Sequence, residues 1–370
     1  MTISLSPEAG RPLRWLLTAT HVPPNGVGGG MIRYTVEFSR ALVRRPDVEL
    51  SLLVAPDAAV GLAEVLGVPP RRVHVLGGSV ITASLRQRLA VGFDANGFDV
   101  FHGAKHLVPR RSRARRLLVV HDLLPFERPT DFGKAKRYLL PRQYAAALDD
   151  ADALACDSQA THDKLVARFP HLAAKATIVS LAMSPTLLSA EPRPIPNLVD
   201  QPFALVVGDA SPRKNLRLVA DIWPAVRRRR PDLLLAIAGP AGWGVLAGLE
   251  QLDDLVMNNA AVRLGHISDA ELRWAYEHAA VVLCPSRLEG FGLPALEAVT
   301  FGAPLVISPD PALVEVAADA ACVVRLDDPL GWVDAICGIA GARSPARRTG
   351  SPRTWDDVAA ETVAVACALH

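Results

Sequence analysis

The order of apolar and polar positions predicts strands that alternate with helices along most of the chain. Short apolar runs, typical of buried parallel strands, occur in the first half at residues 15–19, 50–54, 99–101, 117–120 and 153–156. In the second half they occur at residues 203–207, 233–237, 262–264, 281–284, 305–307 and 322–324. Alternation of such runs with helical segments is the pattern of parallel sheets that are covered on both faces. We therefore expect an α/β fold with two such sheets.

Local signals indicate where several helices begin. A helix in the first half is predicted by apolar residues at helical spacing, namely Met31, Tyr34, Phe38, Ala41 and Leu42. It lies between two strands, which makes a βαβ unit of the Rossmann type. In the second half, Ser268 and Glu271 have the spacing of a capping box. Asn215 is a good N-cap for a helix from Leu216, and we expect Pro224 to bend or interrupt that helix. Further helices are expected near residues 245–255, 330–340 and 356–369.

Length and composition indicate a folded protein of two domains. The chain has 370 residues, of which 50% are apolar and 21% charged, so disorder is excluded and two domains are expected. A proline-rich stretch without periodicity begins at Glu191. We therefore place an N-terminal domain at residues 1–190, a linker at 191–202 and a C-terminal domain at 203–354.

Charge and cysteine usage limit the partners. A net charge of +2 gives no reason to expect nucleic acid. The basic clusters at residues 110–116 and 227–230 are consistent either with solvated helix ends or with peripheral contact to an anionic membrane. Five scattered cysteines without CxxC spacing favour neither disulfides nor zinc, and no apolar run reaches the length of a membrane span. We expect a cytoplasmic protein, with peripheral contact at the inner membrane face left open.

The segment from residue 285 to 298 carries the strongest chemical signal. Glu289 and Glu297 stand eight positions apart around a glycine-containing turn, and Pro294 favours the first turn of a helix. This turn follows an apolar strand, so it lies where open α/β sheets bind ligands, and a helix N-terminus there favours an anion such as a diphosphate. The carboxylates themselves would accept hydrogen bonds from sugar or ribose hydroxyls. For Glu297, simple complementation of the helix dipole in the first turn is the alternative.

Two further groups follow apolar strands. Arg213 and Lys214 come after the strand at residues 203–207 and just before a helix, where two cations suit a diphosphate; a surface turn with solvated charges is the alternative. His121 follows the strand at 117–120 and can donate to or accept from a bound hydroxyl, or it can cap a helix.

A glycine-rich loop that contains Gly29 and Gly30 precedes the first helix. Its spacing is not that of a dinucleotide fingerprint. It can let the backbone approach a sugar or phosphate, or form a flexible lid.

Together these segments resemble the retaining glycosyltransferases of family four, over most of the chain. The resemblance rests on GGMIRY from residue 29, HDLLPFERP from 121, DSQAT from 157, VGDASPRKNL from 207, LGHISDAEL from 264 and PSRLEGFGLPALEA from 285. The last contains the E-x7-E pair of that family and is the most specific. The resemblance implies the GT-B fold, in which two facing Rossmann-like domains enclose a cleft. It also implies that the segment at 355–370 packs on the N-terminal domain.

The resemblance also implies roles for individual residues. Arg213 and Lys214 would bind the donor diphosphate and Glu297 the ribose. The donor sugar would contact Glu289 and the turn made by Gly290, Phe291, Gly292 and Leu293, and the base would lie near His266 and Ile267. His121 would act near the reacting carbon, and Gly29 and Gly30 would approach the donor. Two departures stand out: the glycine loop is longer and carries Pro23-Pro24, and Asp209 occupies a position where some relatives have an arginine.

The activity implied is transfer of a sugar from a nucleoside diphosphate donor, such as GDP-mannose or a UDP- or dTDP-sugar, to an acceptor hydroxyl with retention. The product would belong to a polysaccharide, a glycolipid or a natural product. No cofactor or metal is expected; Asp150-Ala151-Asp152 spells D-x-D but lies in an alanine-rich helical run. A sugar-nucleotide epimerase or hydrolase on the same fold, and a non-catalytic nucleotide-sugar-binding protein, are the alternatives.

Overall fold

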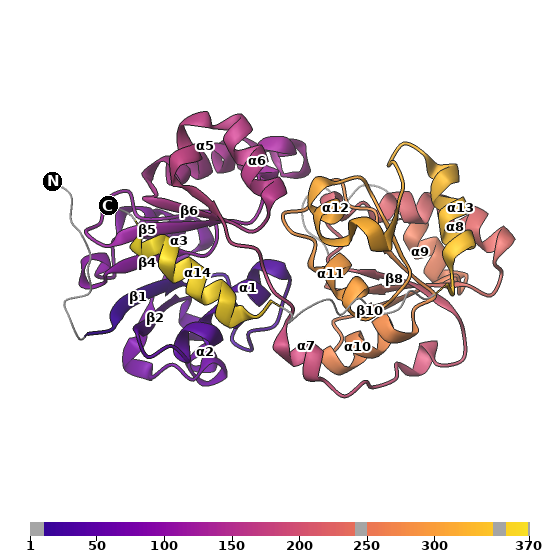
Figure 1. Ribbon diagram of the computed structural model, residues 1–370, viewed down its shortest axis with the longest axis horizontal. Helices are drawn as coiled ribbons and strands as arrows, with labels where there is room; N and C mark the ends of the chain where they lie inside the picture. Colours follow the sequence, from indigo (N-terminus) through magenta and orange to yellow (C-terminus); the bar gives the residue numbers. More distant parts are fainter. Residues whose placement is uncertain (1–10, 241–249, 343–352, 369–370) are drawn as a thin grey trace. The chain divides into compact units, whose positions relative to one another are not determined.

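The computed structural model describes residues 11–240, 250–342 and 353–368. The chain divides into two compact units (Figure 1). The first unit contains the chain up to Pro129, Ala135–Ala182 and the final segment from Arg353; the second contains Thr130–Lys134 and the chain from Met183 to residue 352. Each unit is built around one parallel sheet, as the apolar runs predict.

The sheet of the first unit has seven strands in the order β3-β2-β1-β4-β5-β6-β7. They are β1 (Leu13–Thr18), β2 (Val48–Val54), β3 (Val73–Val75), β4 (Val100–Gly103), β5 (Arg115–Val120), β6 (Ala153–Cys156) and β7 (Ala176–Ile178). All neighbouring pairs are parallel. The sequence missed β3 and β7, which are three-residue edge strands without a fully buried residue, so they lack a continuous apolar run.

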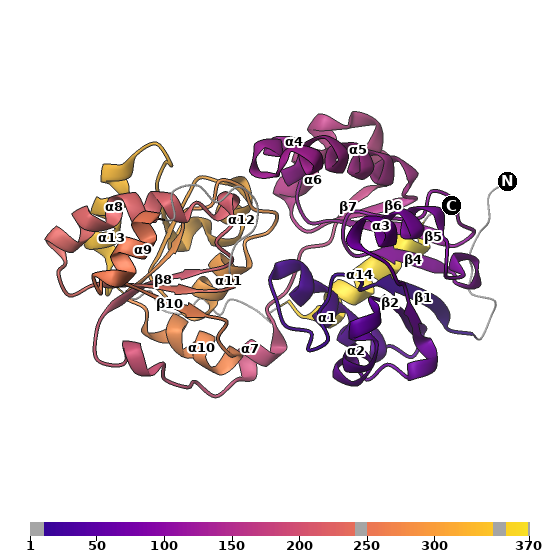
Figure 2. The same cartoon turned by 180° about the vertical axis from the view of Figure 1, so that it is seen from behind.

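Helices cover both faces of this sheet. They are α1 (Gly30–Val43), α2 (Ala59–Leu66), α3 (Val80–Leu89), α4 (Leu124–Glu127), α5 (Lys134–Asp150), α6 (Gln159–Arg168) and α14 (Trp355–Cys367). Alternate residues of β1 face opposite layers, as expected of a strand. Trp15 contacts Phe38 of α1, whereas Leu16 lies in the core that includes Tyr144 of α5. Figure 2 shows α4, α5 and α6 grouped together in this unit.

The final helix α14 packs against α1 within the first unit (Figure 1). Trp355 is buried, and its ring meets that of Tyr34 edge to face at 5.8 Å between centroids. The Arg115 guanidinium donates to the carbonyls of Ala366 and Cys367 at the C-terminal end of α14, at 2.7 and 3.0 Å. These contacts fix both ends of the helix.

The sheet of the second unit has six parallel strands in the order β10-β9-β8-β11-β12-β13. They are β8 (Phe203–Val207), β9 (Leu234–Ala238), β10 (Ala261–Gly265), β11 (Val281–Cys284), β12 (Leu305–Ile307) and β13 (Ala321–Val323). Its helices are α7 (Pro185–Ser189), α8 (Leu216–Arg229), α9 (Glu250–Met257), α10 (Asp269–His278), α11 (Leu293–Thr300), α12 (Pro311–Ala317) and α13 (Pro329–Ile339). One hydrophobic core lies under α8, α9 and α13, and another under α7, α10, α11 and α12. The two cores place helices on both faces of the sheet.

The start of the second unit differs from the linker expected at residues 191–202. Met183, Leu187, Ile195 and Leu198 are buried in one of its cores. Residues 183–202 therefore belong to the second unit, because their scattered apolar side chains cover the sheet without forming a periodic element.

Two local expectations in α8 hold only in part. Asn215 is the N-cap residue of a helix that starts at Leu216, but it lies in the left-handed region with φ of 55°, and its side chain accepts a hydrogen bond from Arg287 and makes no capping bond to the helix. Pro224 does not interrupt α8, which runs from Leu216 to Arg229. Neighbouring Trp223 is buried and donates from its indole nitrogen to the Ala260 carbonyl at 2.9 Å, which holds this turn in place.

The other helix starts agree better with the structure. Ser268 and Glu271 form the capping box of α10, and Pro294 lies in the first turn of α11. Of the helix expected near residues 245–255, the structure shows the part that begins at Glu250; its expected start lies outside the described residues.

Candidate functional site

The candidate site of the second unit lies at the carboxyl edge of its sheet, where the strand order reverses. The chain runs from β8 to β9 and β10 on one side, and β11 to β13 lie on the other side. After β8 the chain enters α8, which packs in one core, and after β11 it enters α11, which packs in the other. The two connections therefore diverge to opposite faces, and such a switch point is where open α/β sheets bind ligands. Arg213, Lys214 and Glu289 lie in these two connections.

Glu289 links both cations. Its Oε2 accepts from Arg213 Nη1 at 2.8 Å and its Oε1 from Lys214 Nζ at 2.6 Å. The Ser286 hydroxyl donates to the same Oε1 at 2.6 Å. Such charge-assisted hydrogen bonds are short and strong, so the three charged side chains form one preorganised cluster.

The cluster is buried and holds two cations and one carboxylate. The side chains of Glu289, Lys214 and Arg213 are 7%, 10% and 20% exposed. Burial alone would raise the pKa of Glu289, but the charges of Lys214 and Arg213 outweigh it and lower that pKa to about 2. Glu289 is therefore ionised beside its two cations, which are the groups in this cluster that suit an anion.

Backbone and side-chain bonds hold the two connections together. The Arg287 N–H donates to the Arg213 carbonyl at 2.7 Å, and Arg287 Nε donates to Asn215 Oδ1 at 3.0 Å. The Ser308 hydroxyl donates to the Ser286 carbonyl at 2.6 Å. The positions of the cations relative to Glu289 are thus set by the loops as well as by the ion pairs.

Two glycines allow the backbone to pass close to Lys214. Gly208 has φ of 141°, and a Cβ there would come within 3.0 Å of Lys214 Cε. Gly239, after β9, has φ of 149°, and a Cβ there would lie 2.0 Å from the Gly208 carbonyl oxygen. Both positions require glycine, because larger residues would displace the backbone that carries the lysine.

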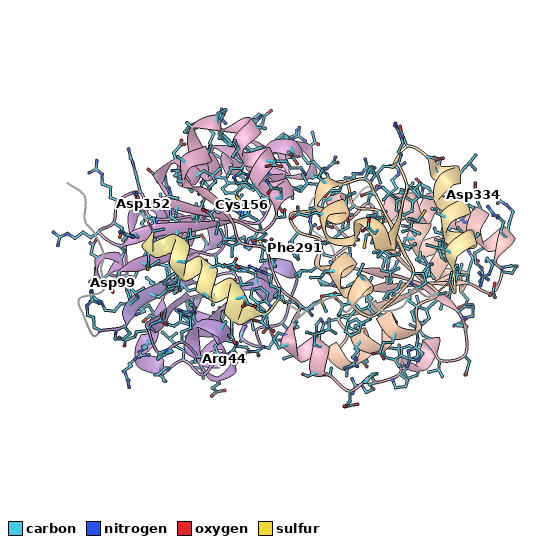
Figure 3. The ribbon with its side chains drawn as sticks, viewed as in Figure 1. Arg44, Asp99, Asp152, Cys156, Phe291 and Asp334 are labelled. Carbon is cyan, nitrogen blue, oxygen red and sulfur yellow. The ribbon has the colours of Figure 1, made fainter. Side chains whose placement is uncertain are left out.

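The start of α11 agrees with the turn expected from Gly290 to Leu293. Gly292 precedes the helix with φ of 93°, and Phe291, labelled in Figure 3, is 7% exposed. The Ala295 N–H donates to the Gly292 carbonyl at 3.0 Å, and Pro294 has no N–H. Within the first three positions of α11, the N–H offered to a ligand is therefore that of Leu293.

Glu297 is buried in α11 and lies beyond the first turn, where a helix dipole would favour a carboxylate. It is the fifth residue of α11, whose first turn has no acidic residue, so the expectation of a first-turn carboxylate is wrong. Glu297 is 3% exposed and accepts from the Tyr276 hydroxyl at 2.7 Å. A buried carboxylate is costly without partners, so this hydrogen bond explains in part why Glu297 is tolerated there. Sequence reasoning missed Tyr276, which lies at a core position of α10.

His266 and Ile267 follow β10 at the same edge of the sheet. Gly265 ends the strand in the left-handed region with φ of 64°, and Ser268 caps α10. His266 is exposed and Ile267 is half-buried. The short connection therefore presents backbone and an imidazole at the carboxyl edge.

The candidate site of the first unit contains a buried His–Asp pair. His121 follows β5 and Asp157 follows the neighbouring β6, which Cys156 ends (Figure 3). His121 Nδ1 lies 2.6 Å from Asp157 Oδ2, and Nε2 lies 3.1 Å from the Ala104 carbonyl oxygen. Both ring nitrogens are thus occupied, so a bound hydroxyl would have to replace one of these contacts. Sequence reasoning missed Asp157, although its position directly after a strand is the signal that identified His121.

Three more histidines lie around this pair. Burial first, and then nearby positive charge, lowers the pKa of His21, His102 and His106 to about 3 each. His102 Nε2 lies 3.3 Å from the Tyr34 hydroxyl, and the His106 ring stacks on Tyr144 at 4.8 Å. These side chains are neutral near pH 7.

The glycine loop leads into α1. Gly29 is the N-cap of the helix with an extended backbone, and Gly30 is its first residue. A Cβ at Gly29 would have no heavy atom within 4 Å, apart from chain neighbours, so space is open there. A Cβ at Gly28 would come within 2.2 Å of Ile32 Cδ1. The close packing is therefore at Gly28, and Gly29 borders open space.

The D-x-D sequence is engaged in ion pairs. Asp150 pairs with Arg88 at 2.5 Å and Asp152 with Arg116 at 2.6 Å. In the described parts of the chain, no three or more His, Cys, Asp or Glu side chains group as metal ligands would.

The basic clusters are partly used within the fold. Arg115 holds α14, Arg116 pairs with Asp152, Arg229 with Asp334 at 2.5 Å and Arg230 with Asp232 at 2.9 Å. Arg110, Arg111 and Arg113 are exposed. Within residues 11–240, 250–342 and 353–368, the helices are all too short or too polar to cross a bilayer.

Two family models match consecutive parts of the chain. The model described as Glycosyltransferase Family 4 matches residues 28–187, and the model described as Glycosyl transferases group 1 matches residues 190–335. Together the two models cover most of the chain, which therefore belongs to the glycosyltransferases that they describe. This confirms the glycosyltransferase family predicted from the sequence motifs, whereas retention stays a prediction.

Curated relatives of this group 1 family member include mannosyltransferases of O-antigen synthesis. It is 30% identical to O-antigen chain mannosyltransferase B of Escherichia coli over 64% of this chain. It is 28% identical to the serotype-specific mannosyltransferase WbdA of Escherichia coli over 56% of this chain. The matched parts span 63% and 28% of the lengths of these two relatives.

Solved structures of similar fold confirm the GT-B fold class. Sucrose-phosphate synthase from Thermosynechococcus elongatus matches with a TM-score of 0.64 at 17% identity, over 96% of each chain. WaaG, a glycosyltransferase involved in lipopolysaccharide biosynthesis, matches with a TM-score of 0.64 at 13% identity, over 94% of this chain and 95% of that one. HepE of Anabaena, whose structure contains UDP-glucose, matches with a TM-score of 0.58 at 14% identity, over 96% of this chain and 98% of that one.

Proposed function

We propose that this chain transfers a sugar from a nucleoside diphosphate sugar to an acceptor hydroxyl. The cluster of Arg213, Lys214 and Glu289 carries this proposal. It places two cations and one ionised carboxylate, buried together, at the switch point of the second sheet. Two adjacent cations suit a diphosphate, and rigid cations in a site of low exposure stabilise charge that develops on a leaving group.

The donor would bind in the second unit. Arg213 and Lys214 contact the diphosphate, and the Leu293 N–H at the start of α11 contributes a further donor. Glu289 and the turn from Gly290 to Gly292 border the sugar. Glu297 accepts from the ribose hydroxyls, and the connection at His266 and Ile267 holds the base.

In the reaction, the bond between the anomeric carbon and the phosphate oxygen breaks as the acceptor oxygen bonds to that carbon. The leaving phosphate takes the proton of the acceptor hydroxyl, and Arg213 and Lys214 neutralise its charge. This front-face attack retains the anomeric configuration. It needs no metal, because protein cations supply the positive charge. Glu289 is a poor covalent nucleophile, since two cations and a hydroxyl already engage its oxygens.

We further propose a mannosyl donor, which the names of the O-antigen mannosyltransferases of Escherichia coli support. His121 of the first unit would contact a substrate hydroxyl near the reacting carbon, and Gly29 and Gly30 would approach the donor. The exposed Arg110, Arg111 and Arg113 leave room for peripheral contact with an anionic membrane, which would suit a lipid-linked acceptor.

The deciding experiment compares donor alone with donor plus acceptor. GDP-mannose, UDP-glucose, UDP-N-acetylglucosamine and dTDP-rhamnose are first screened by thermal shift, since a ligand that binds only the folded state raises stability. The best donor is then incubated with and without p-nitrophenyl α-mannoside and with lipid extracts as acceptors. We expect acceptor-dependent release of the nucleoside diphosphate and a product with an α linkage by NMR. Rapid conversion without acceptor indicates an epimerase or hydrolase, and tight binding without turnover indicates a binding protein.

A further inference from the structure

The His121–Asp157 pair is built into the sheet of the first unit. Val120 and Cys156 are register partners at the ends of β5 and β6, and His121 and Asp157 are the next residues of their strands. His121 is 9% and Asp157 4% exposed. The Asp157 N–H donates to the Val120 carbonyl at 3.4 Å, so backbone bonds continue up to the pair.

The partners of the His121 ring define how many protons it carries. Nδ1 faces a carboxylate oxygen of Asp157, and Nε2 faces the carbonyl oxygen of Ala104. A carbonyl and an ionised carboxylate can only accept, and a neutral imidazole has a single N–H. One of the two contacts would then bring two lone pairs together, unless the proton were on the Asp157 carboxyl, whose pKa is raised first of all by burial. The geometry is satisfied when both ring nitrogens carry a proton.

The groups that face His121 support a charged ring. Asp157 and Asp122 carry the neighbouring carboxyl groups. The nearby histidines are His102 of β4, with His21 and His106 in the segments that follow β1 and β4, and all three are neutral near pH 7. Tyr34 of α1 presents its ring edge on at 4.9 Å. Burial alone would lower the pKa of His121, but the Asp157 carboxylate, together with the Ala104 carbonyl and Asp122, outweighs burial and raises it.

We propose that Asp157 is a positioning residue for the transfer reaction, which holds His121 in one plane with a proton on each nitrogen. His121 then serves as a hydrogen-bond donor and not as a general base. Its Nε2–H, which faces the Ala104 carbonyl at 3.1 Å, would also donate to a hydroxyl or ring oxygen of the substrate that approaches in the plane of the ring. The role in transfer rests on the proposed function, whereas the protonation state of the pair does not.

The first test measures the protonation state without any substrate. Long-range ¹H–¹⁵N correlation spectra of the ¹⁵N-labelled protein report whether each ring nitrogen carries a proton, and His121→Gln assigns the signal. We expect both nitrogens of His121 to be protonated at pH 7 and the ring to titrate above the ordinary histidine pKa of about 6.5. A neutral His121 at pH 7 would overturn the proposal whether or not the protein transfers sugar. This measurement needs no Asp157 variant to fold.

The second test removes the carboxylate. In Asp157→Asn, burial is opposed only by the Ala104 carbonyl and the Asp122 carboxylate, so the pKa of His121 falls and the ring loses its second proton as pH rises through the lowered value. The kcat/KM for GDP-mannose is expected to fall by roughly tenfold at pH 8 and by much less at pH 6, a difference that a general structural defect would not produce. Circular dichroism of the variant checks the fold.

A double variant and a matched control complete the test. In a His121→Gln background, Asp157→Asn should cause no further loss, because Asp157 acts through that ring. An equal loss in both backgrounds would mean that Asp157 is merely structural. Asp163→Asn removes the exposed partner of His162, whose Nδ1 lies 3.1 Å away on the same helix, and should leave the pH profile unchanged. A wild-type protein with a charged His121 but no transfer activity would refute the proposed function alone.

Discussion

Lys214 Nζ lies 2.6 Å from Glu289 Oε1, although the two residues belong to different connections at the edge of one sheet. The same lysine side chain passes over Gly208, where a Cβ would meet its Cε at 3.0 Å. Glu289 therefore orients the Lys214 side chain, and the glycine at position 208 leaves the space that this side chain needs. This relationship joins the two motifs that the sequence identified separately.

Removing either partner should damage transfer. Lys214→Ala deletes a charge that stabilises the leaving diphosphate, and Glu289→Ala leaves two buried cations without their carboxylate. We expect kcat/KM for GDP-mannose to fall at least roughly tenfold in each, which is about 1.4 kcal/mol of transition-state binding. Arg217→Ala on the surface of α8, where Arg217 pairs with Asp221 at 3.5 Å, is the control and should have nearly normal rates. Nearly normal rates in both site variants would place the reaction elsewhere.

Acid should selectively remove the contribution of Glu289 to stability. Its pKa is lowered from 4.5 to about 2, so the folded state favours the ionised form. The resulting stabilisation is complete above about pH 4.5 and is lost as pH falls toward 2. Glu289→Gln lacks this titration, so its melting temperature should lie below that of the wild type at pH 6 and approach it near pH 3. A difference that stays constant from pH 6 to pH 3 would show that Glu289 is not held ionised by its cations.

The sequence predicted most of the sheet strands because buried parallel strands are continuous apolar runs, as β8 and β11 are. It could not predict β3 and β7, which are short and partly exposed, or the place of residues 183–202 in the second unit. Their apolar side chains contact a core formed by distant segments, and such contacts leave no local period.

The sequence predicts the candidate site residues from one rule, that ligands bind at the carboxyl ends of parallel strands. This rule identifies Arg213, Lys214, Glu289 and His121, which all follow strands of their sheets. The ion pairs were not predictable, since the 2.8 Å contact of Arg213 with Glu289 joins residues 76 positions apart. Asp157 also follows a strand, so the same rule could have identified it as a partner of His121.

The close approach at Gly239 should make this position intolerant of alanine. A Cβ there would lie 2.0 Å from the Gly208 carbonyl oxygen, and φ of 149° is strained for any other residue. We expect Gly239→Ala to lower the free energy of unfolding by about 1–3 kcal/mol and to weaken nucleotide binding, because Gly208 would move with Lys214. Denaturant melts and titration calorimetry with GDP measure the two effects.

Gly338→Ala is the matched control for that substitution. Gly338 lies in α13, and a Cβ there would meet no heavy atom within 4 Å. Alanine should be neutral or stabilising by up to about 1 kcal/mol, because it favours the helix. Equal destabilisation by both substitutions would contradict a specific clash at Gly239.

Tyr276→Phe should remove the hydrogen-bond donor of Glu297 without changing the Glu297 carboxylate itself. The substitution keeps the ring that stacks on Phe301 at 6.0 Å and removes the hydroxyl that donates to Glu297 at 2.7 Å. Loss of a donor to a buried carboxylate costs about 1–3 kcal/mol of stability. If Glu297 binds the ribose, KM for the donor should rise more than kcat falls, because the carboxylate loses its orientation. Unchanged KM together with the stability loss would assign Glu297 a structural role.

The contact of Trp355 with Tyr34 should determine whether α14 stays attached to the first unit. Trp355→Ala removes a fully buried ring, and such truncations cost about 3–5 kcal/mol. The helix should then detach first, since the polar contacts that would oppose this lie near its two ends: those of Arg115, the exposed Arg44–Asp356 pair, and Arg353, which pairs with Glu361 and donates to the Ser180 carbonyl. Limited proteolysis is expected to cut the variant near residue 353 at protease concentrations that leave the wild type intact.

Trp355→Phe is the control and should lose much less protection. It preserves an aromatic ring beside Tyr34, and the indole N–H that it removes has no partner within the described residues. Equal protection of the alanine variant and the wild type would mean that other contacts hold α14.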